Sequence, residues 1–259
     1  MLLVHENNLK NKINNNYNGK GKLLEQFYLD EYTKTKDALL AIDFGKDKCD
    51  AFKKAANIIN DYYKKLDKFV SDNKISSQSK LRSTFLEEFS SYLFEDNQYI
   101  KDGTLGIYNK GIYAGMKIDS DLRVNIVKKD VDFCIGKKTE MWIDGQEYEI
   151  ILPIIAVEVK TYLDATMFGE VQYSSKLMKN ATPNVKTYVL METNEVEKEK
   201  ILSARNDNAL NEMFVLRADK ESLIDASVLE DYYKEVTSSI EDITIKRDIA
   251  YPGRLIKIV

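Results

Sequence analysis

The chain has 259 residues, of which 44% are apolar and 31% are charged, a composition that fits one large globular domain or a domain with a smaller helical lobe. Two cysteines, Cys49 and Cys134, stand far apart without CxxC spacing, which argues against a disulfide framework and a structural zinc site. The single histidine, His5, excludes Ser-His-Asp and Cys-His catalysis and histidine-rich metal sites. Any catalysis must therefore rest on carboxylates, lysines or hydroxyls.

The formal net charge is −4, but the charge is distributed unevenly along the chain. Residues 192–235 carry six basic and twelve acidic side chains, whereas residues 50–82 carry eight basic and four acidic ones. Binding of a polyanion needs local rather than global positive charge, so the acidic total does not exclude nucleic acid as a partner. A solvated helix face is the simpler interpretation of each single lysine in that region.

Hydropathy gives no sign of a membrane segment. No run of eighteen or more uncharged apolar residues occurs, and the N-terminal MLLVHENNLKNK becomes polar too soon for a signal peptide. We therefore expect a soluble, cytoplasmic chain without a membrane partner.

The first part of the chain predicts helices after a weakly ordered start. Residues 1–20 hold seven asparagines and show little periodicity, which favours a loose arm. From Lys22 to Asp96, apolar residues recur at spacings of three and four, as they do on the buried faces of helices. This part of the sequence therefore predicts a helical lobe.

Beyond Gly103 the apolar period falls to about two, which indicates strands. The runs expected to form them are 105–113, 122–127, 131–135, 141–152 and 153–159, with a hairpin turn at Asp144-Gly145. The rest of the pattern predicts a helix over 167–179 ended by Pro183, a buried strand over 187–191, a short strand at 214–216, an acidic helix over 223–236 and an apolar C-terminal segment at 255–258. The expected fold class is α/β, with a mixed central sheet flanked by helices and an N-terminal helical lobe.

Ionisable residues interrupt an apolar strand pattern at 153–160. Alternation places Ile155, Val157 and Val159 on one face and Glu158 with Lys160 on the other. Two ionisable groups in such a place cost desolvation energy unless they pair with each other or meet a metal or substrate. An ordinary salt bridge at a strand end is the alternative interpretation, and an ExK triplet alone does not separate the two.

A second strand supplies further carboxylates. Over residues 130–135, alternation places Val131 and Phe133 on one face and Asp130 and Asp132 on the other. Pairing of this strand with 153–160 would bring carboxylates of both strands together. Two hard oxygen ligands and a lysine are expected of a Mg²⁺-dependent phosphodiesterase, because the metal lowers the pKa of a bound water and the lysine orients that water or stabilises developing charge.

Asp132 followed by Glu158-Val159-Lys160 resembles the D…(D/E)xK core of the PD-(D/E)xK nuclease superfamily. The segments DVDFCIG and LPIIAVEVKTYLD are similar to type II restriction endonucleases of the DdeI and BbvCI kind, and the similarity covers residues 80–190. Lys129-Asp130-Val131-Asp132 replaces the literal Pro-Asp pair, so Asp130 and Asp132 are alternative ligands. We favour Asp132 because it directly precedes Phe133. The resemblance implies Mg²⁺ held by Asp132 and Glu158, with Lys160 positioning or activating water.

The resemblance also implies supporting residues on two helices. Members often carry an acid on the preceding helix, where Glu87 and Glu88 are adjacent candidates. At roughly 100° per residue, the centre of the apolar arc lies about 90° from Glu88 and about 170° from Glu87, which predicts Glu88 as the ligand and Glu87 in water. Gln172 resembles a glutamine that many members carry on the helix after the ExK strand. A simple salt bridge for Glu88 and a solvated amide for Gln172 are the alternatives.

The primary hypothesis is a Mg²⁺-dependent type II restriction endonuclease, or one subunit of one, that hydrolyses double-stranded DNA. One site cuts one strand, so double-strand cleavage needs a homodimer or a second related subunit; the resemblance implies a target near CTNAG. Residues 1–75 are expected to form the arm and helical lobe, a candidate DNA-binding part, and residues 76–259 the nuclease core with C-terminal additions. The alternatives are a PD-(D/E)xK nuclease of repair or recombination and a non-catalytic DNA-binding protein.

Overall fold

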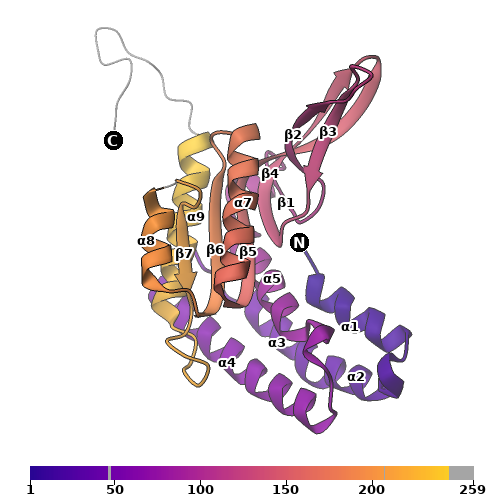
Figure 1. Cartoon of the computed structure of the whole chain (residues 1–259). Coiled ribbons are helices and arrows are strands. Elements are labelled where there is room, and N and C mark those ends of the chain that lie inside the picture. Colours follow the sequence, from indigo (N-terminus) through magenta and orange to yellow (C-terminus); the bar gives the residue numbers. More distant parts are fainter. Residues whose placement is uncertain (46–47, 207, 245–259) are drawn as a thin grey trace.

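The chain begins with a lobe of helices below a twisted sheet (Figure 1). The computed structural model describes residues 1–45, 48–206 and 208–244. The helices that precede the sheet are α1 Val4–Asn14, η1 Tyr17–Gly19, α2 Gly21–Phe27, the π-turn η2 Tyr28–Tyr32, α3 Thr33–Leu40, α4 Lys48–Asp72, η3 Ser77–Ser79, α5 Leu81–Phe94 and α6 Gln98–Lys101. The expected helical lobe is therefore present.

The prediction of a loose arm over residues 1–20 was wrong, because α1 is a helix packed along α5. Leu9 is fully buried, and the backbone N–H groups of His5 and Glu6 donate to the Glu88 carboxylate at 2.9 and 3.0 Å. Such first-turn amides have no acceptor inside their own helix, and a negative charge there is favoured by the helix dipole. Tertiary contacts thus stabilise α1 as a helix, although the apolar periodicity of its sequence is weak.

Helix α5 connects the lobe to the sheet. The ring of Phe85 lies 4.3 Å from that of Tyr62 on α4, and at the other end of α5 the ring of Phe94 lies 5.8 Å from that of Phe133 on the first long strand. These contacts belong to one apolar cluster that runs from the lobe into the sheet. α5 is therefore surrounded by protein on most of its circumference.

In the described parts of the chain, seven strands form one mixed sheet. They are β1 Gly106–Tyr108, β2 Ile112–Ile118, β3 Val124–Lys129, β4 Phe133–Ile143, β5 Gln146–Leu163, β6 Lys186–Asn194 and β7 Glu212–Val215. β4 and β5 pair antiparallel through the predicted turn at Asp144-Gly145, and β6 and β7 follow in parallel to β5. β2 joins the first half of β5 and carries β3, so these two strands project to one side (Figure 1).

Helices cover both faces of the sheet, which confirms the expected fold class. On one face, Val157 and Tyr188 belong to the apolar cluster that includes α5 and α9 (Ala226–Thr244). On the other face, Val189 packs with Phe168 of α7 (Ala165–Ala181) and Ile201 of α8 (Lys198–Asn206). The result is a three-layer arrangement with the buried strands β5 and β6 at its centre.

The predicted run 141–152 is divided by the hairpin turn: its first three residues end β4, and its part from Gln146 onwards joins the predicted run 153–159 in one strand, β5, which runs through Pro153. Proline offers no backbone donor, so a central strand accommodates it only at an irregularity of the ladder. The register with β4 shifts between Ile135 and Gly136, and Gly136 lies opposite Pro153. A Cβ at Gly136 would lie 2.5 Å from the Leu152 carbonyl oxygen, so this close approach requires glycine.

The remaining predicted elements are mostly confirmed. The helix at 167–179, the strands at 187–191 and 214–216 and the helix at 223–236 correspond to α7, β6, β7 and α9. The apolar segment 255–258 lies outside the described residues, and the domain boundary at 75/76 stays a prediction. None of the described helices is long and apolar enough to span a bilayer.

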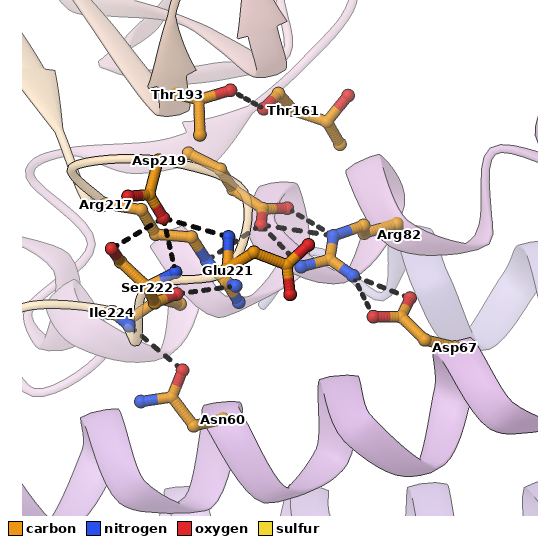
Figure 2. A network of polar contacts seen from close by, with 11 residues as sticks. Asn60, Asp67, Arg82, Thr161, Thr193, Arg217, Asp219, Glu221, Ser222 and Ile224 are labelled. Carbon is orange, nitrogen blue, oxygen red and sulfur yellow. Dashed lines mark hydrogen bonds and ion pairs between the residues drawn. The ribbon is translucent and has the colours of Figure 1, made fainter.

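An ionic network fastens the lobe to the end of β6 (Figure 2). The Arg82 guanidinium of α5 donates to Asp67 of α4 at 2.6 Å and to Glu192 of β6 at 2.7 Å and 2.9 Å. Arg217, beyond β7, approaches the same Glu192 carboxylate at 3.2 Å. Both guanidinium groups lie over the ring of the buried Tyr63, at 4.2 and 5.4 Å from its centroid. Helices α4 and α5 are thereby fixed relative to the sheet.

Candidate active site

Asp132 and Glu158 face each other across the β4–β5 pair. Phe133 pairs with Val157, so one further step of the antiparallel register sets Asp132 opposite Glu158. The odd-numbered residues 155–159 of β5 are buried against the lobe, which turns Glu158 and Lys160 to the other face. The apolar pattern that sets the register thus also sets the two carboxylates.

Asp132 lies at a bend immediately before β4 rather than inside a strand. Val131 packs with Cys134 on one side of the sheet, whereas Phe133 packs on the lobe side. The prediction that Val131 and Phe133 share a face was therefore wrong, because regular pairing begins only at Phe133. Asp130 is turned elsewhere and accepts the Gly111 N–H at 3.1 Å. Of the two alternative aspartates, the structure brings Asp132 to the ExK motif.

Lys160 joins the two carboxylates. Its Nζ lies 3.0 Å from Asp132 Oδ2 and 3.0 Å from Glu158 Oε2. The same Asp132 oxygen accepts the backbone N–H of Val159 at 2.8 Å, which fixes the aspartate against β5. The side chains of Asp132, Glu158 and Lys160 keep 27%, 15% and 27% of their exposure, so the group is accessible from solvent.

The electrostatics of the group favour a charged lysine. Burial raises the pKa of Glu158, the Asp132 charge adds to this effect, and Lys160 opposes it. Burial alone would lower the pKa of Lys160, but the charges of Asp132 and Glu158 outweigh burial and raise it above its ordinary value. Lys160 in this state is an ammonium group, suited to stabilising negative charge rather than to accepting a proton.

Glu87 is half-buried and lies within reach of the charges of this group, which corrects the prediction that it points into water. Burial raises the pKa of Glu87 to about 7, and the negative charge of Asp132 contributes in the same direction, while Lys160 opposes it. The helical-wheel argument assumed that α5 has one buried side. It failed because the lobe and the sheet bury opposite sides of α5, so both adjacent glutamates meet protein.

Glu88, the predicted peripheral ligand, points into the lobe instead. Its side chain is fully buried and accepts hydrogen bonds from the His5 and Glu6 amides, from the Tyr32 hydroxyl at 2.5 Å and from the Tyr92 hydroxyl. Burial raises the pKa of Glu88, although the hydroxyl donors oppose this shift. The carboxylate stabilises the start of α1, a structural role that the sequence pattern did not indicate.

Gln172 lies on α7, half-buried and one position after the buried Val171. In the described part of the chain it has no hydrogen bond to Asp132, Glu158 or Lys160. The structure therefore agrees with its predicted place at the edge of the buried face, and its supporting role stays a prediction.

The carboxylates suit a hard divalent cation. Among the described residues no three His, Cys, Asp or Glu side chains converge as a ready cation cage. Mg²⁺ in enzymes is commonly held by one or two carboxylates together with water and substrate oxygens, and Asp132 and Glu158 supply that number. Burial raises the pKa values of Glu158 and Glu87, and the negative charge of Asp132 adds to both shifts, a repulsion that a cation would relieve.

The family model of the Bpu10I restriction endonuclease matches residues 78–238, more than half of the chain. The chain belongs to this family. The matched region begins just before α5 and includes Glu87, Asp132, Glu158, Lys160 and Gln172. Membership makes this Bpu10I-family chain a type II restriction endonuclease.

A solved structure shares the fold of this chain. The native BbvCI A2B2 tetramer contains a chain that is 16% identical, with a TM-score of 0.75 over 93% of this chain and 98% of that chain. The PspGI restriction endonuclease in complex with substrate DNA is 12% identical, over 84% of this chain and 93% of that one, and its TM-score of 0.37 is too low to support an argument. No curated protein matches the chain.

Proposed function

We propose that Asp132, Glu158 and Lys160 form the catalytic centre with which this Bpu10I-family endonuclease hydrolyses phosphodiester bonds in double-stranded DNA, with Mg²⁺ as cofactor. The observation that carries the proposal is the Lys160 ammonium at 3.0 Å from both carboxylates. Bringing a lysine and two acids together near the end of a buried strand costs desolvation free energy. Partly buried groups of this kind are common at functional sites.

Each residue has a role that its surroundings support. Asp132 and Glu158 would hold the cation through their oxygens, and Mg²⁺, when bound, supplies a water of lowered pKa and neutralises phosphate charge. Lys160 would orient the attacking water and stabilise the negative charge that develops on the phosphate, since its ammonium form is favoured here. The Val159 N–H keeps Asp132 in position.

Glu87 takes the supporting place that the sequence assigned to Glu88. Burial raises the pKa of Glu87 to about 7, the charges of Asp132 and Glu158 add to this shift, and Lys160 and Lys80 oppose it. A cation held by Asp132 and Glu158 would favour the ionised form of Glu87. We assign Glu87 as a peripheral ligand of the cation or of a cation-bound water.

Assembly follows from the chemistry of one site. A single centre cuts one strand, so cleavage of a duplex needs a second centre, from a copy of this chain or from a related subunit. BbvCI is an A2B2 tetramer, and its similarity over the length of this chain supports an assembly of this kind here.

Cleavage of supercoiled plasmid tests the proposal. The purified chain, Glu158→Gln and Lys160→Ala would be incubated with plasmid and Mg²⁺, with an EDTA control, and the products mapped at their ends. Glu149→Gln and Lys138→Ala are matched controls. These two residues lie on the same hairpin, outside the proposed centre, and their exposed side chains form an ion pair with an N–O distance of 2.6 Å.

We expect discrete cuts by the wild type and both controls, and at least about a 10²-fold loss in both centre variants. Linear fragments would indicate a homodimer, whereas nicks at a fixed sequence would indicate one half of a heterodimer. Retention of cleavage by Glu158→Gln and Lys160→Ala would refute the assigned centre.

A further inference from the structure

A groove of about 490 Å³ lies between α1, the start of α5 and the turn that joins β1 to β2. Its charged lining residues in the described chain are all basic, namely Lys12, Lys80 and Lys110. The exposed amides of Asn7 and Asn11 point from α1 along the same groove. Leu2, Leu3 and Val4 supply the apolar part of the lining, so the polar part of the groove combines amide groups with positive charge.

The three lysines are free to bind an external anion. Within the described residues Lys12, Lys80 and Lys110 form no ion pair, whereas Lys10 and Lys36 of the same lobe are both paired with Glu6. Lys12 lies over the ring of Tyr17, 4.9 Å from its centroid, and the charge of Lys80 acts on Glu87. Three positive charges around one concave surface still favour an anion placed between them.

The residues that line the groove adjoin elements that carry the proposed catalytic centre. The Asn109 carbonyl accepts the Val131 N–H at 3.1 Å, so the lysine-bearing turn is fixed beside Asp132. On the other side, the positive charge of Lys80 acts on Glu87, which faces the centre. In Figure 1 the start of α1 lies beside α5 and below β1.

We propose that this lysine groove, formed by Lys12, Lys80 and Lys110, holds the phosphate backbone of the DNA substrate beside the catalytic centre. The inference rests on the proposed function, because the polyanion is identified by its continuity with a phosphodiester-cleaving site. Phosphate contacts of this kind position a duplex and contribute salt-dependent affinity without reading its sequence. The basic side chains of the groove would thus bind the DNA backbone, while the adjacent acidic centre hydrolyses one phosphodiester bond.

The experiment compares two sets of lysines for DNA affinity as a function of salt. The groove variant is Lys12→Gln/Lys80→Gln/Lys110→Gln, and the control is Lys54→Gln/Lys64→Gln/Lys68→Gln on the exposed side of α4. Fluorescence anisotropy with a labelled duplex of mixed sequence, in EDTA, gives the dissociation constant at several salt concentrations. Thermal melts check that both variants fold, and Lys110→Gln alone, on the turn outside the helices, serves as a second groove variant.

A plot of log K against log salt has a negative slope. Loss of three phosphate contacts makes this slope less steep by about 2.7, and loss of one contact makes it less steep by about 0.9. We expect these changes in the groove variants, a roughly tenfold or larger loss of affinity in the triple variant, and no change of slope in the control. The inference is overturned if the groove variants keep the wild-type slope and affinity. It is also overturned if the α4 control loses as much DNA affinity as the groove variant, or if the wild type does not bind the duplex. Plasmid cleavage by the wild type is measured separately, so a cutting enzyme with an unaffected groove variant refutes only the groove.

Discussion

Replacement of Glu192 by alanine should destabilise the fold because it leaves buried arginine charge without its partner. Glu192 retains 3% of its side-chain exposure, Arg217 retains 8% and Arg82 retains 28%. Removal of one member of a buried ion pair typically costs about 3–5 kcal/mol. Arg82 keeps Asp67 as a partner and is reached by water, so Arg217, left with the Ser222 carbonyl at 3.0 Å, dominates the loss.

We therefore expect the free energy of unfolding of Glu192→Ala to fall by about 3 kcal/mol, the low end of that range. Urea denaturation followed by circular dichroism measures this change, and an unchanged m-value shows that the unfolded reference state is comparable. The matched control is Glu195→Ala, three residues along, which removes an exposed pair with Lys220 at 2.9 Å. The control should change stability by less than about 1 kcal/mol.

The loss expected for Glu192→Ala depends on the burial of the charges and not on charge in general. If Glu192→Ala lowers stability no more than Glu195→Ala does, water or a rearranged Arg217 compensates the charge, and the network is not the fastening between lobe and sheet. A double-mutant cycle with Arg82→Ala separates the two arginines, since its coupling energy reports only the Arg82–Glu192 contact.

The remaining predictions concern His5 and the two adjacent glutamates. Burial lowers the pKa of His5 from 6.5 to about 3, so the unfolded state binds the extra proton and stability falls by about 1.4 kcal/mol per pH unit as the pH drops from 6.5 towards 3. His5→Gln should flatten the stability profile in that window, and parallel profiles of the two proteins would contradict the assignment. Glu87→Gln should slow plasmid cleavage by about 10–100-fold with little change in stability, whereas Glu88→Gln should lower the free energy of unfolding by about 1–3 kcal/mol and leave the turnover of folded enzyme unchanged. The reverse pattern would restore Glu88 to the site.

The sequence predicted the sheet side of the centre well because the signal there is local. Alternation along β5 determines which face Glu158 and Lys160 occupy, and the Asp144-Gly145 turn brings β4 back along β5. Together they predict that an acid just before β4 meets the ExK motif, as Asp132 does. Catalytic roles cannot be obtained from this geometry alone and stay with the cleavage experiment.

The helical side was harder to predict because its determinants are tertiary. α1 has the composition of a loop, and its helical form depends on Glu88, eighty-three residues from His5 in the chain. No local pattern contains that contact. The sequence does place Glu88 and Tyr92 one helical turn apart, a spacing at which their side chains can form a hydrogen bond, as they do. This spacing indicates a buried carboxylate only once the helix is known to be enclosed by protein.

The same enclosure gives α5 its place in the proposed mechanism. One side of the helix supplies Glu88 to the lobe, and another presents Glu87 to the charges of the β4–β5 centre. The ring of Phe85, on the same helix, lies 4.3 Å from that of Tyr62 on α4, across the predicted 75/76 boundary. A side chain removed from the lobe would therefore shift α5, and with it the carboxyl that faces the centre. The lobe is then part of the framework that positions the proposed peripheral ligand, because the position of Glu87 depends on contacts made on both sides of its helix.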